Sequence, residues 1–101
     1  MIVRILTEAE NDLFESATWY EDRKEGLGDR SLTEFDRARR LILSRATNLP
    51  KVETDSVGRD IRRVPLRHFP FNAVVEILPN EVVILAVAHG RRKPQYWLDR
   101  T

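Results

Sequence analysis

The sequence predicts a two-layer α+β domain in which a short N-terminal strand precedes a helical hairpin, packed on one face of an antiparallel sheet of about four strands. Apolar residues recur at helical spacing between residues 9 and 49. Residues 71–78 instead alternate as a strand does, and the apolar run 82–88 is typical of a strand buried on both faces. At 101 residues, 42% hydrophobic and 33% charged, the chain fits a single domain over residues 1–101.

The N-terminal half contains the predicted strand and hairpin. Residues 2–6 are apolar apart from one arginine and predict a strand. Thr7, with Glu10 three residues later, is typical of a helix N-cap with its capping-box partner. The segment Gly26-Leu27-Gly28 interrupts the helical pattern, and a second helix is expected from residue 29 or 31 to about residue 48. Two helices joined by so few residues form an antiparallel hairpin, whose apolar faces need a sheet to cover them.

Two features of the predicted helix surfaces allow either a structural or a binding role. Trp19 lies outside the apolar stripe of the first helix, and we expect its ring to fold over the neighbouring helix rather than to contact a partner. A row of arginines on the second helix is accompanied by Glu34 and Asp36. Because no aromatic residues interleave with these arginines, a solvated face with an Asp36–Arg40 ion pair is a better interpretation than a nucleic-acid surface.

The C-terminal half is expected to hold three strands in meander order after a polar connection over residues 51–60. The first strand, 61–66, contains Pro65, which favours a position at an edge of the sheet. In the second strand, 71–78, odd-numbered and even-numbered side chains face opposite sides of the sheet. The third strand is the apolar run 82–88, which returns antiparallel to the second after a Pro-Asn turn.

Charge is unevenly distributed along the chain. The formal net charge is +1, but residues 1–58 hold 9 basic and 12 acidic residues, whereas residues 59–101 hold 8 basic and 4 acidic ones. Nearly all the basic residues are arginines, which suit bidentate contacts with carboxylates, phosphates and bases. The C-terminal half is therefore a candidate surface for an acidic partner or a nucleic acid, the alternative being an ordinary mixed-charge surface.

Candidate site residues gather where the last predicted strand ends. Metal-free RNA cleavage needs a base, an acid and cations for the developing phosphorane charge, and aromatic side chains beside arginines stack on unpaired bases. The candidate catalytic residues are His89, Arg92 and Tyr96. The candidate residues for binding a nucleic acid or another target are Arg62, Arg63, Arg67, Arg91, Lys93, Trp97 and Arg100. The structural alternatives are a His89 satisfied by backbone groups and a Tyr96–Trp97 cap over the sheet.

The sequence does not support several other functional classes. There is no cysteine, and the two histidines, His68 and His89, do not stand at ligand spacing with other ligand residues, so no metal site is expected. Glycine-rich phosphate-binding motifs and a nucleophile elbow are absent, so no cofactor is expected. We also expect no signal peptide and no membrane-spanning segment, which makes a cytoplasmic location the default.

Taken in order, the motifs resemble the RelE/ParE superfamily of type II toxins, and within it the ParE-like or plasmid stabilization branch. The match covers almost the whole chain, and the ordered set is far more specific than any single piece. The residues that carry it are Ala17-Thr18-Trp19-Tyr20-Glu21, Gly26-Leu27-Gly28, Phe35, Arg62-Arg63, Arg67-His68-Phe69-Pro70-Phe71, Ala86-Val87-Ala88-His89, Arg91-Arg92-Lys93-Pro94-Gln95-Tyr96-Trp97 and Arg100.

The resemblance implies a toxin that a cognate antitoxin neutralises in a hetero-oligomer. One branch of the family poisons DNA gyrase, the other is a metal-free endoribonuclease that cuts mRNA on the ribosome, and a degenerate, non-toxic relative is a third alternative. Where the mRNA-cutting members tend to place arginines, this chain has Asn72 and Gly90, although Arg91 or Arg92 could substitute for the latter. Tyr96 matches their C-terminal tyrosine. The resemblance therefore favours gyrase binding over catalysis.

Overall fold

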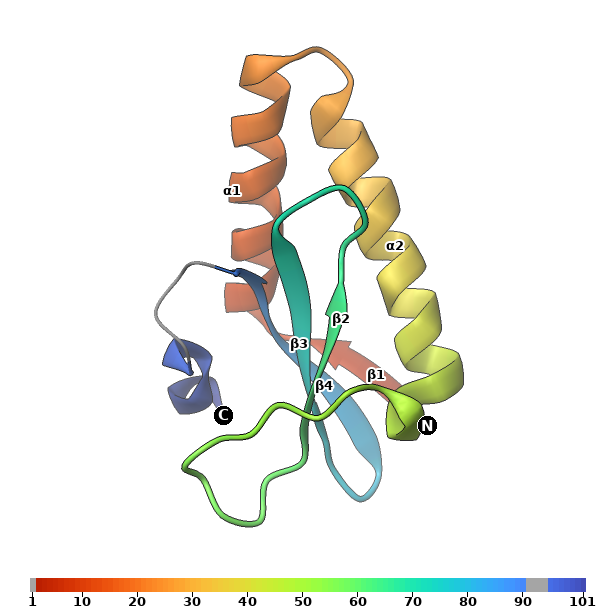
Figure 1. Ribbon diagram of the computed structural model, residues 1–101, viewed down its shortest axis with the longest axis vertical. Helices are drawn as coiled ribbons and strands as arrows, with labels where there is room; N and C mark the ends of the chain where they lie inside the picture. The colour runs from red at the N-terminus through yellow and green to blue at the C-terminus, as the bar shows by residue number, and fades with distance from the viewer. Residues whose placement is uncertain (1, 91–94) are drawn as a thin grey trace.

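A helical hairpin lies across one face of a four-stranded sheet and extends beyond its end (Figure 1). The computed structural model describes residues 2–90 and 95–101. In chain order its elements are β1 (Ile2–Ile5), α1 (Thr7–Arg23), α2 (Leu27–Arg45), the 3-10 helix η1 (Ala46–Asn48), β2 (Ile61–Pro65), β3 (Phe71–Ile77), β4 (Glu81–His89) and the 3-10 helix η2 (Tyr96–Arg100). The strand order is β1-β4-β3-β2, so β3 and β4 are central. The predicted two-layer α+β architecture is confirmed.

The direction of β1 differs from the prediction of an antiparallel sheet. β2, β3 and β4 form the predicted antiparallel meander, and β2, with its Pro65, lies at an edge. β1, however, is parallel to β4, with Ile5 opposite Ile84, so the sheet is mixed. Alternation of apolar and polar residues marks the two faces of a strand but not its direction. The chain between β1 and β4 contains the helical hairpin, β2 and β3, so the connection is long enough for the parallel arrangement.

The central strand β4 is buried on both faces because each side of the sheet is covered. Val82–Ala88 are all buried, as the apolar run predicted. Leu13 of α1 and Phe35 of α2 belong to the core on one side, which we call the helix face. Trp97 of η2 belongs to a second core on the opposite side, which we call the far face. The C-terminal segment is therefore part of the folded core.

A β-bulge in β4 determines which of its residues reach the far face. The register with β3 shifts between Val74 and Val75, which lie opposite Ala86 and Ile84 respectively, leaving Leu85 as an extra residue. Leu85 and Ala86 consequently both belong to the far-face core. The bulge widens the apolar surface on which η2 packs.

The start of α1 differs from the predicted capping box. The helix begins at Thr7, and the N-cap residue is Leu6, which makes no side-chain capping hydrogen bond. The prediction of Thr7 as N-cap is therefore wrong. The Leu6 amide still donates to the carbonyl of Ile84 in the sheet, at 3.1 Å, while the Leu6 carbonyl already accepts from the Glu10 amide at 3.0 Å. Strand pairing thus fixes the junction one residue earlier than a Thr7 cap would need.

α2 begins at Leu27, before the predicted start, because α1 supplies its cap. The Glu21 carboxylate accepts hydrogen bonds from the amides of Gly26 and Gly28, both at 2.9 Å. Gly28 also permits close approach of the helices, since a Cβ at this position would lie 2.6 Å from the carbonyl oxygen of Ala17. A cap that crosses the hairpin is invisible to a search for capping residues beside the helix.

The outer surface of α2 carries ion pairs between residues of the same helix. Asp36 accepts a hydrogen bond from Arg40 at 3.1 Å, as predicted, and one from Arg39 at 3.3 Å. Glu34 is paired with Arg37 at 3.0 Å. Three arginines of α2, Arg37, Arg39 and Arg40, are therefore paired with carboxylates of the same helix. No helix within the described part of the chain is long and apolar enough to cross a membrane.

Candidate functional site

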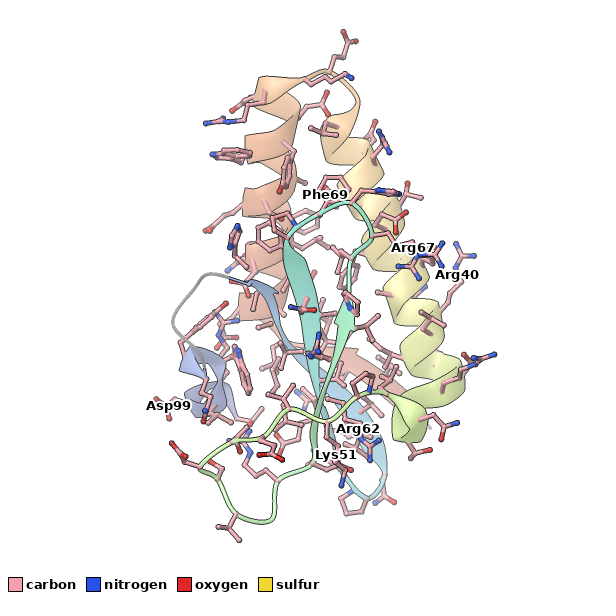
Figure 2. The ribbon with its side chains drawn as sticks, in the orientation of Figure 1. Arg40, Lys51, Arg62, Arg67, Phe69 and Asp99 are labelled. Atoms are coloured by element: carbon pink, nitrogen blue, oxygen red, sulfur yellow. The ribbon has the colours of Figure 1, made fainter. Side chains whose placement is uncertain are left out.

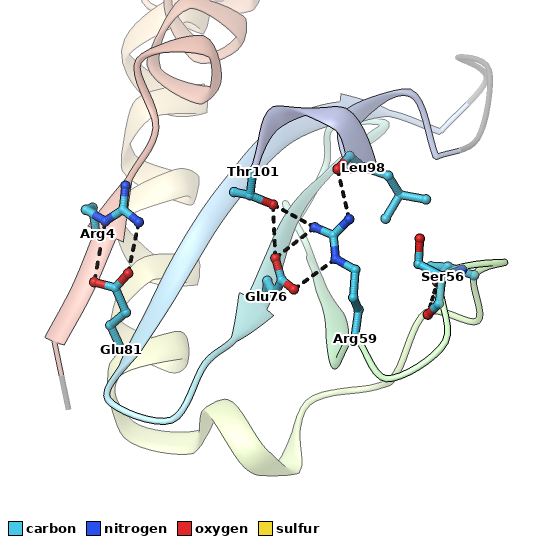
Figure 3. A network of polar contacts seen from close by, with 8 residues as sticks. Arg4, Ser56, Arg59, Glu76, Glu81, Leu98 and Thr101 are labelled. Atoms are coloured by element: carbon cyan, nitrogen blue, oxygen red, sulfur yellow. Dashed lines mark hydrogen bonds and ion pairs between the residues drawn. The ribbon is translucent and has the colours of Figure 1, made fainter.

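The C-terminal helix η2 is fixed on the far face of the sheet by a buried ion pair (Figure 3). Glu76 of β3 is buried and accepts two hydrogen bonds from Arg59, at 2.9 and 2.8 Å. Arg59 also donates to the carbonyl of Leu98 at 2.8 Å and to the hydroxyl of Thr101 at 2.7 Å. The Arg59 guanidinium holds the pKa of the Glu76 carboxyl below its usual value. These bonds join the segment before β2, the sheet and the C-terminus.

A second ion pair joins η2 to α1 and protects the edge of β4. β1 ends at Ile5, so no strand among the described residues pairs with the last part of β4 on that side. Asp12 accepts from the Val87 amide at 3.1 Å, and Arg100 donates to the Leu85 carbonyl at 3.0 Å. Asp12 and Arg100 are bonded to each other at 2.8 Å, which raises the pKa of Arg100. Side chains thus satisfy backbone groups that a neighbouring strand would otherwise pair.

A hollow of about 180 Å³ lies on the far face, between the strand ends and η2. Its lining includes Arg63 from β2, Asn72 from β3, His89 from the end of β4, and Tyr96 and Trp97 from η2. The antiparallel register brings the start of β3 beside the end of β4, which explains why residues distant in sequence converge here. This far-face hollow brings together four of the predicted site residues, Arg63, His89, Tyr96 and Trp97.

The neighbouring residues Arg62 and Arg63 have different roles because successive side chains of a strand point to opposite faces. Arg63 lines the far-face hollow. Arg62 lies on the helix face and is paired with Asp60 at 2.9 Å. It also donates to the carbonyls of Thr47 and Leu49, at 2.6 and 3.0 Å, near the end of η1. The Arg62 side chain, only 12% exposed, therefore stabilises a helix end.

The remaining predicted cations fall outside the far-face hollow or outside the described residues. Arg67 lies in the turn between β2 and β3, on the side of α2 (Figure 2). The pKa of Glu34 in α2 is lowered mainly by its hydrogen bond to Arg37, with a smaller contribution from the charge of Arg67. Three predicted residues, Arg91, Arg92 and Lys93, lie outside the described residues.

Trp97 and Arg100 are both engaged within the fold. Trp97 is 5% exposed and packs in the far-face core, the position expected of a C-terminal cap over the sheet. The Arg100 side chain is 16% exposed and is held by Asp12. Both residues place η2, and with it Tyr96, at the far-face hollow.

His89 and Tyr96 both line the far-face hollow and are residue types that can donate and accept protons, although the His89 ring itself lies toward Phe71 on the helix face. The His89 ring packs edge-on against Phe71, with ring centroids 5.0 Å apart. The Arg100 guanidinium lies 5.1 Å from the centre of the Tyr96 ring. Arg63 is the one arginine or lysine among the described lining residues. Across residues 2–90 and 95–101, no three His, Asp or Glu side chains gather as metal ligands would.

Sequence reasoning missed the two carboxylates that hold η2. Glu76 did carry a signal, because a charged residue within an apolar strand needs a partner when it is buried. The partner, Arg59, is 17 residues away in a polar connection, and nothing in the sequence distinguishes it from the other arginines. In the sequence, Asp12 has no feature that distinguishes it from other polar residues of an amphipathic helix. Its hydrogen bonds to Val87 and Arg100 can be recognised only in the folded structure.

A larger groove of about 320 Å³ lies between α1 and the end of β4. We call it the α1 groove, and its lining residues are Asp12, Glu15, Ser16, Trp19, Tyr20, Phe71, Val87 and His89. Trp19 is 51% exposed. Its ring packs edge-on against Tyr20 at 5.0 Å, with the Arg23 guanidinium 3.6 Å from its centre. Trp19 therefore contacts neighbours on its own helix, in contrast to the expectation that it folds over α2.

The fold has a counterpart among solved structures. No protein-family model matches the sequence, and no curated protein matches it significantly. A chain of the "Chromosomal ParDE TA system from P. aeruginosa" has a TM-score of 0.69, with 88% of this chain and 95% of that chain covered at 17% sequence identity. This chain has the fold of that ParDE chain. The fold implied by the resemblance to the RelE/ParE superfamily is thereby confirmed.

Proposed function

We propose that the chain is the toxin of a type II toxin–antitoxin module and that a cognate antitoxin neutralises it in a hetero-oligomer. The observation that carries the proposal is the fold shared with a ParDE toxin–antitoxin chain across 88% of the sequence. The motif order of the sequence supports it, since these motifs resemble the same superfamily. A cytoplasmic location, where gyrase, ribosomes and mRNA are found, belongs to the same proposal.

For the target we propose DNA gyrase, inhibited by binding. Phosphoryl transfer builds up negative charge that an RNA-cleaving site must stabilise with well-placed cations. The far-face hollow has Asn72 and Gly90 where the mRNA-cutting members tend to place arginines, and Arg63 is its one arginine or lysine among the described residues. The absence of arginines at these two sequence positions supports inhibition by contact rather than by catalysis.

Cleavage of mRNA is the second candidate, because Arg63, His89 and Tyr96 line the same hollow. In this reaction one of His89 and Tyr96 would remove the proton of a 2′-hydroxyl. The 2′-oxygen would bond to phosphorus as the bond to the 5′-oxygen breaks, and the other residue would protonate that leaving oxygen. Arg63 would stabilise the phosphorane charge, and Arg92 remains a candidate for the same role.

Induction of the chain in cells separates the two targets. If gyrase is the target, supercoiling is lost, mRNA 5′ ends stay unchanged, and Tyr96→Phe retains toxicity. Codon-phased mRNA cleavage with normal supercoiling would contradict gyrase binding. Cleavage that is lost in Tyr96→Phe but kept in the control Arg67→Gln, outside the hollow, would establish the second candidate. A chain that leaves growth and both readouts unchanged would be the non-toxic relative.

A further inference from the structure

We propose that the α1 groove receives a lysine or arginine side chain of the antitoxin. This inference rests on the proposed function, because it specifies the chemistry by which the antitoxin contacts the toxin. The α1 groove and the far-face hollow are two different surfaces of the molecule, and His89 is the one described residue that lines both.

The walls of the α1 groove are aromatic rings arranged edge to face. Trp19 packs on Tyr20 at 5.0 Å, Tyr20 on Phe71 at 6.3 Å, and Phe71 on His89 at 5.0 Å. Aromatic faces attract cations through their quadrupoles, most strongly in tryptophan. The chain already uses this attraction at the rim, where the Arg23 guanidinium lies 3.6 Å from the centre of the Trp19 ring. A cation from a partner would make the same kind of contact with the rings that Arg23 does not cover.

The charge of the groove is negative and only partly compensated. Asp12 and Glu15 both line it. Asp12 is paired with Arg100 at 2.8 Å, so its charge is balanced within the chain. Glu15 is exposed and makes no hydrogen bond or ion pair with another described residue. A cationic side chain lying along the rings would place its charge beside Glu15, which completes the electrostatic complementarity.

The groove is large enough to receive a long amino-acid side chain. At about 320 Å³ it lies at the lower end of the range for small-molecule sites. Lys and Arg side chains combine an apolar stem with a charged head, which matches aromatic walls with a carboxylate at the rim. An antitoxin with such a residue would be anchored by its stem and oriented by its charge.

The chemistry of the groove can be tested on the isolated chain with N-acetyl-arginine amide as the probe and N-acetyl-citrulline amide as its neutral isostere. In ¹⁵N spectra, we expect the arginine probe alone to shift the Trp19 indole and the Glu15 and Ser16 amides saturably. Glu15→Gln should weaken its binding roughly 2- to 5-fold. Glu10→Gln, an exposed carboxylate of α1 outside the groove, should not. Equal shifts with the citrulline probe, or unchanged binding by Glu15→Gln, would overturn the proposal.

The partner can be tested with the protein encoded beside this chain, used as the antitoxin. Glu15→Arg should weaken its binding at least tenfold, and a Lys→Glu or Arg→Glu change in the antitoxin should restore binding to that variant alone. Normal binding by Glu15→Arg would overturn the groove proposal while leaving the toxin–antitoxin function intact. If the neighbouring protein does not bind the unaltered chain, both proposals fail together.

Discussion

Removal of Arg59 is expected to destabilise the fold far more than removal of Arg4, although their ion pairs have similar lengths. The Arg59–Glu76 contact is 2.8 Å and the Arg4–Glu81 contact 2.9 Å (Figure 3). The pairs differ in exposure, since the side chains are 21% and 8% exposed in the first pair but 50% and 29% exposed in the second. The difference in burial therefore decides which ion pair contributes more to the stability of the fold.

The expected loss of stability depends on the environment of the carboxylate that loses its arginine partner. Arg59→Ala leaves the Glu76 carboxylate buried, with the Thr101 hydroxyl at 3.2 Å as its remaining partner. Breaking a fully buried pair costs about 3–5 kcal/mol. Because the site is partly open to water, we expect about 2–4 kcal/mol, a large share of the ~5–15 kcal/mol that stabilises a domain. After Arg4→Ala, water solvates Glu81, and the midpoint of urea unfolding should stay close to that of the unaltered chain.

Urea unfolding followed by circular dichroism measures both effects, and pH provides a second readout. The Arg59 guanidinium lowers the pKa of Glu76 in the folded chain, relative to about 4.3 in the unfolded chain. This stabilisation is fully present above the pKa that Glu76 has in the unfolded chain. It is lost as the pH falls through the pKa that Glu76 has in the folded chain. The difference in the free energy of unfolding between the unaltered chain and Arg59→Ala should therefore become smaller below about pH 4. Equal midpoint shifts for Arg59→Ala and Arg4→Ala, or a difference independent of pH, would refute this reasoning.

Three further substitutions test how the helices and the C-terminus are held. Gly28→Ala should destabilise the chain by about 1–3 kcal/mol in urea unfolding, because its Cβ meets a backbone carbonyl of α1 at 2.6 Å; Gly90→Ala, whose Cβ would have 3.6 Å of clearance, is the control. Glu21→Ala should cost about 0.5–2 kcal/mol by removing the cap of α2, and an unchanged midpoint would argue against that cap. Asp12→Ala should speed hydrogen exchange in residues 95–101 by releasing Arg100, whereas unchanged exchange would show that other contacts hold η2.

Sequence periodicity predicted the elements and their buried faces because burial leaves a local pattern. Leu13 and Phe35 lie in the core on the helix face as their helical spacing indicated. The separation of Arg62 and Arg63 also follows from strand geometry, since adjacent strand residues face opposite sides. Grouping the two arginines as one cationic cluster overlooked that constraint.

The features that sequence reasoning could not predict depend on contacts between distant segments. The parallel direction of β1 is a property of its pairing with β4, a strand distant in the sequence. The cap that Glu21 provides to α2 requires the hairpin to be formed. The positions of Asp12 and Glu76 beside arginines of other segments likewise become visible only in the fold. A charged residue such as Glu76 in an apolar strand signals that a partner is needed, but the local sequence does not identify the partner in any of these contacts.

Controlled induction of the chain in growing cells, alone and together with the protein encoded beside it, tests the proposed toxin role most directly. If the chain is a toxin with a cognate antitoxin, induction alone should reduce viable counts, and co-induction should restore them through a complex that can be purified. Normal growth on induction of the folded chain, or growth inhibition that the neighbouring protein neither binds nor relieves, would contradict that role.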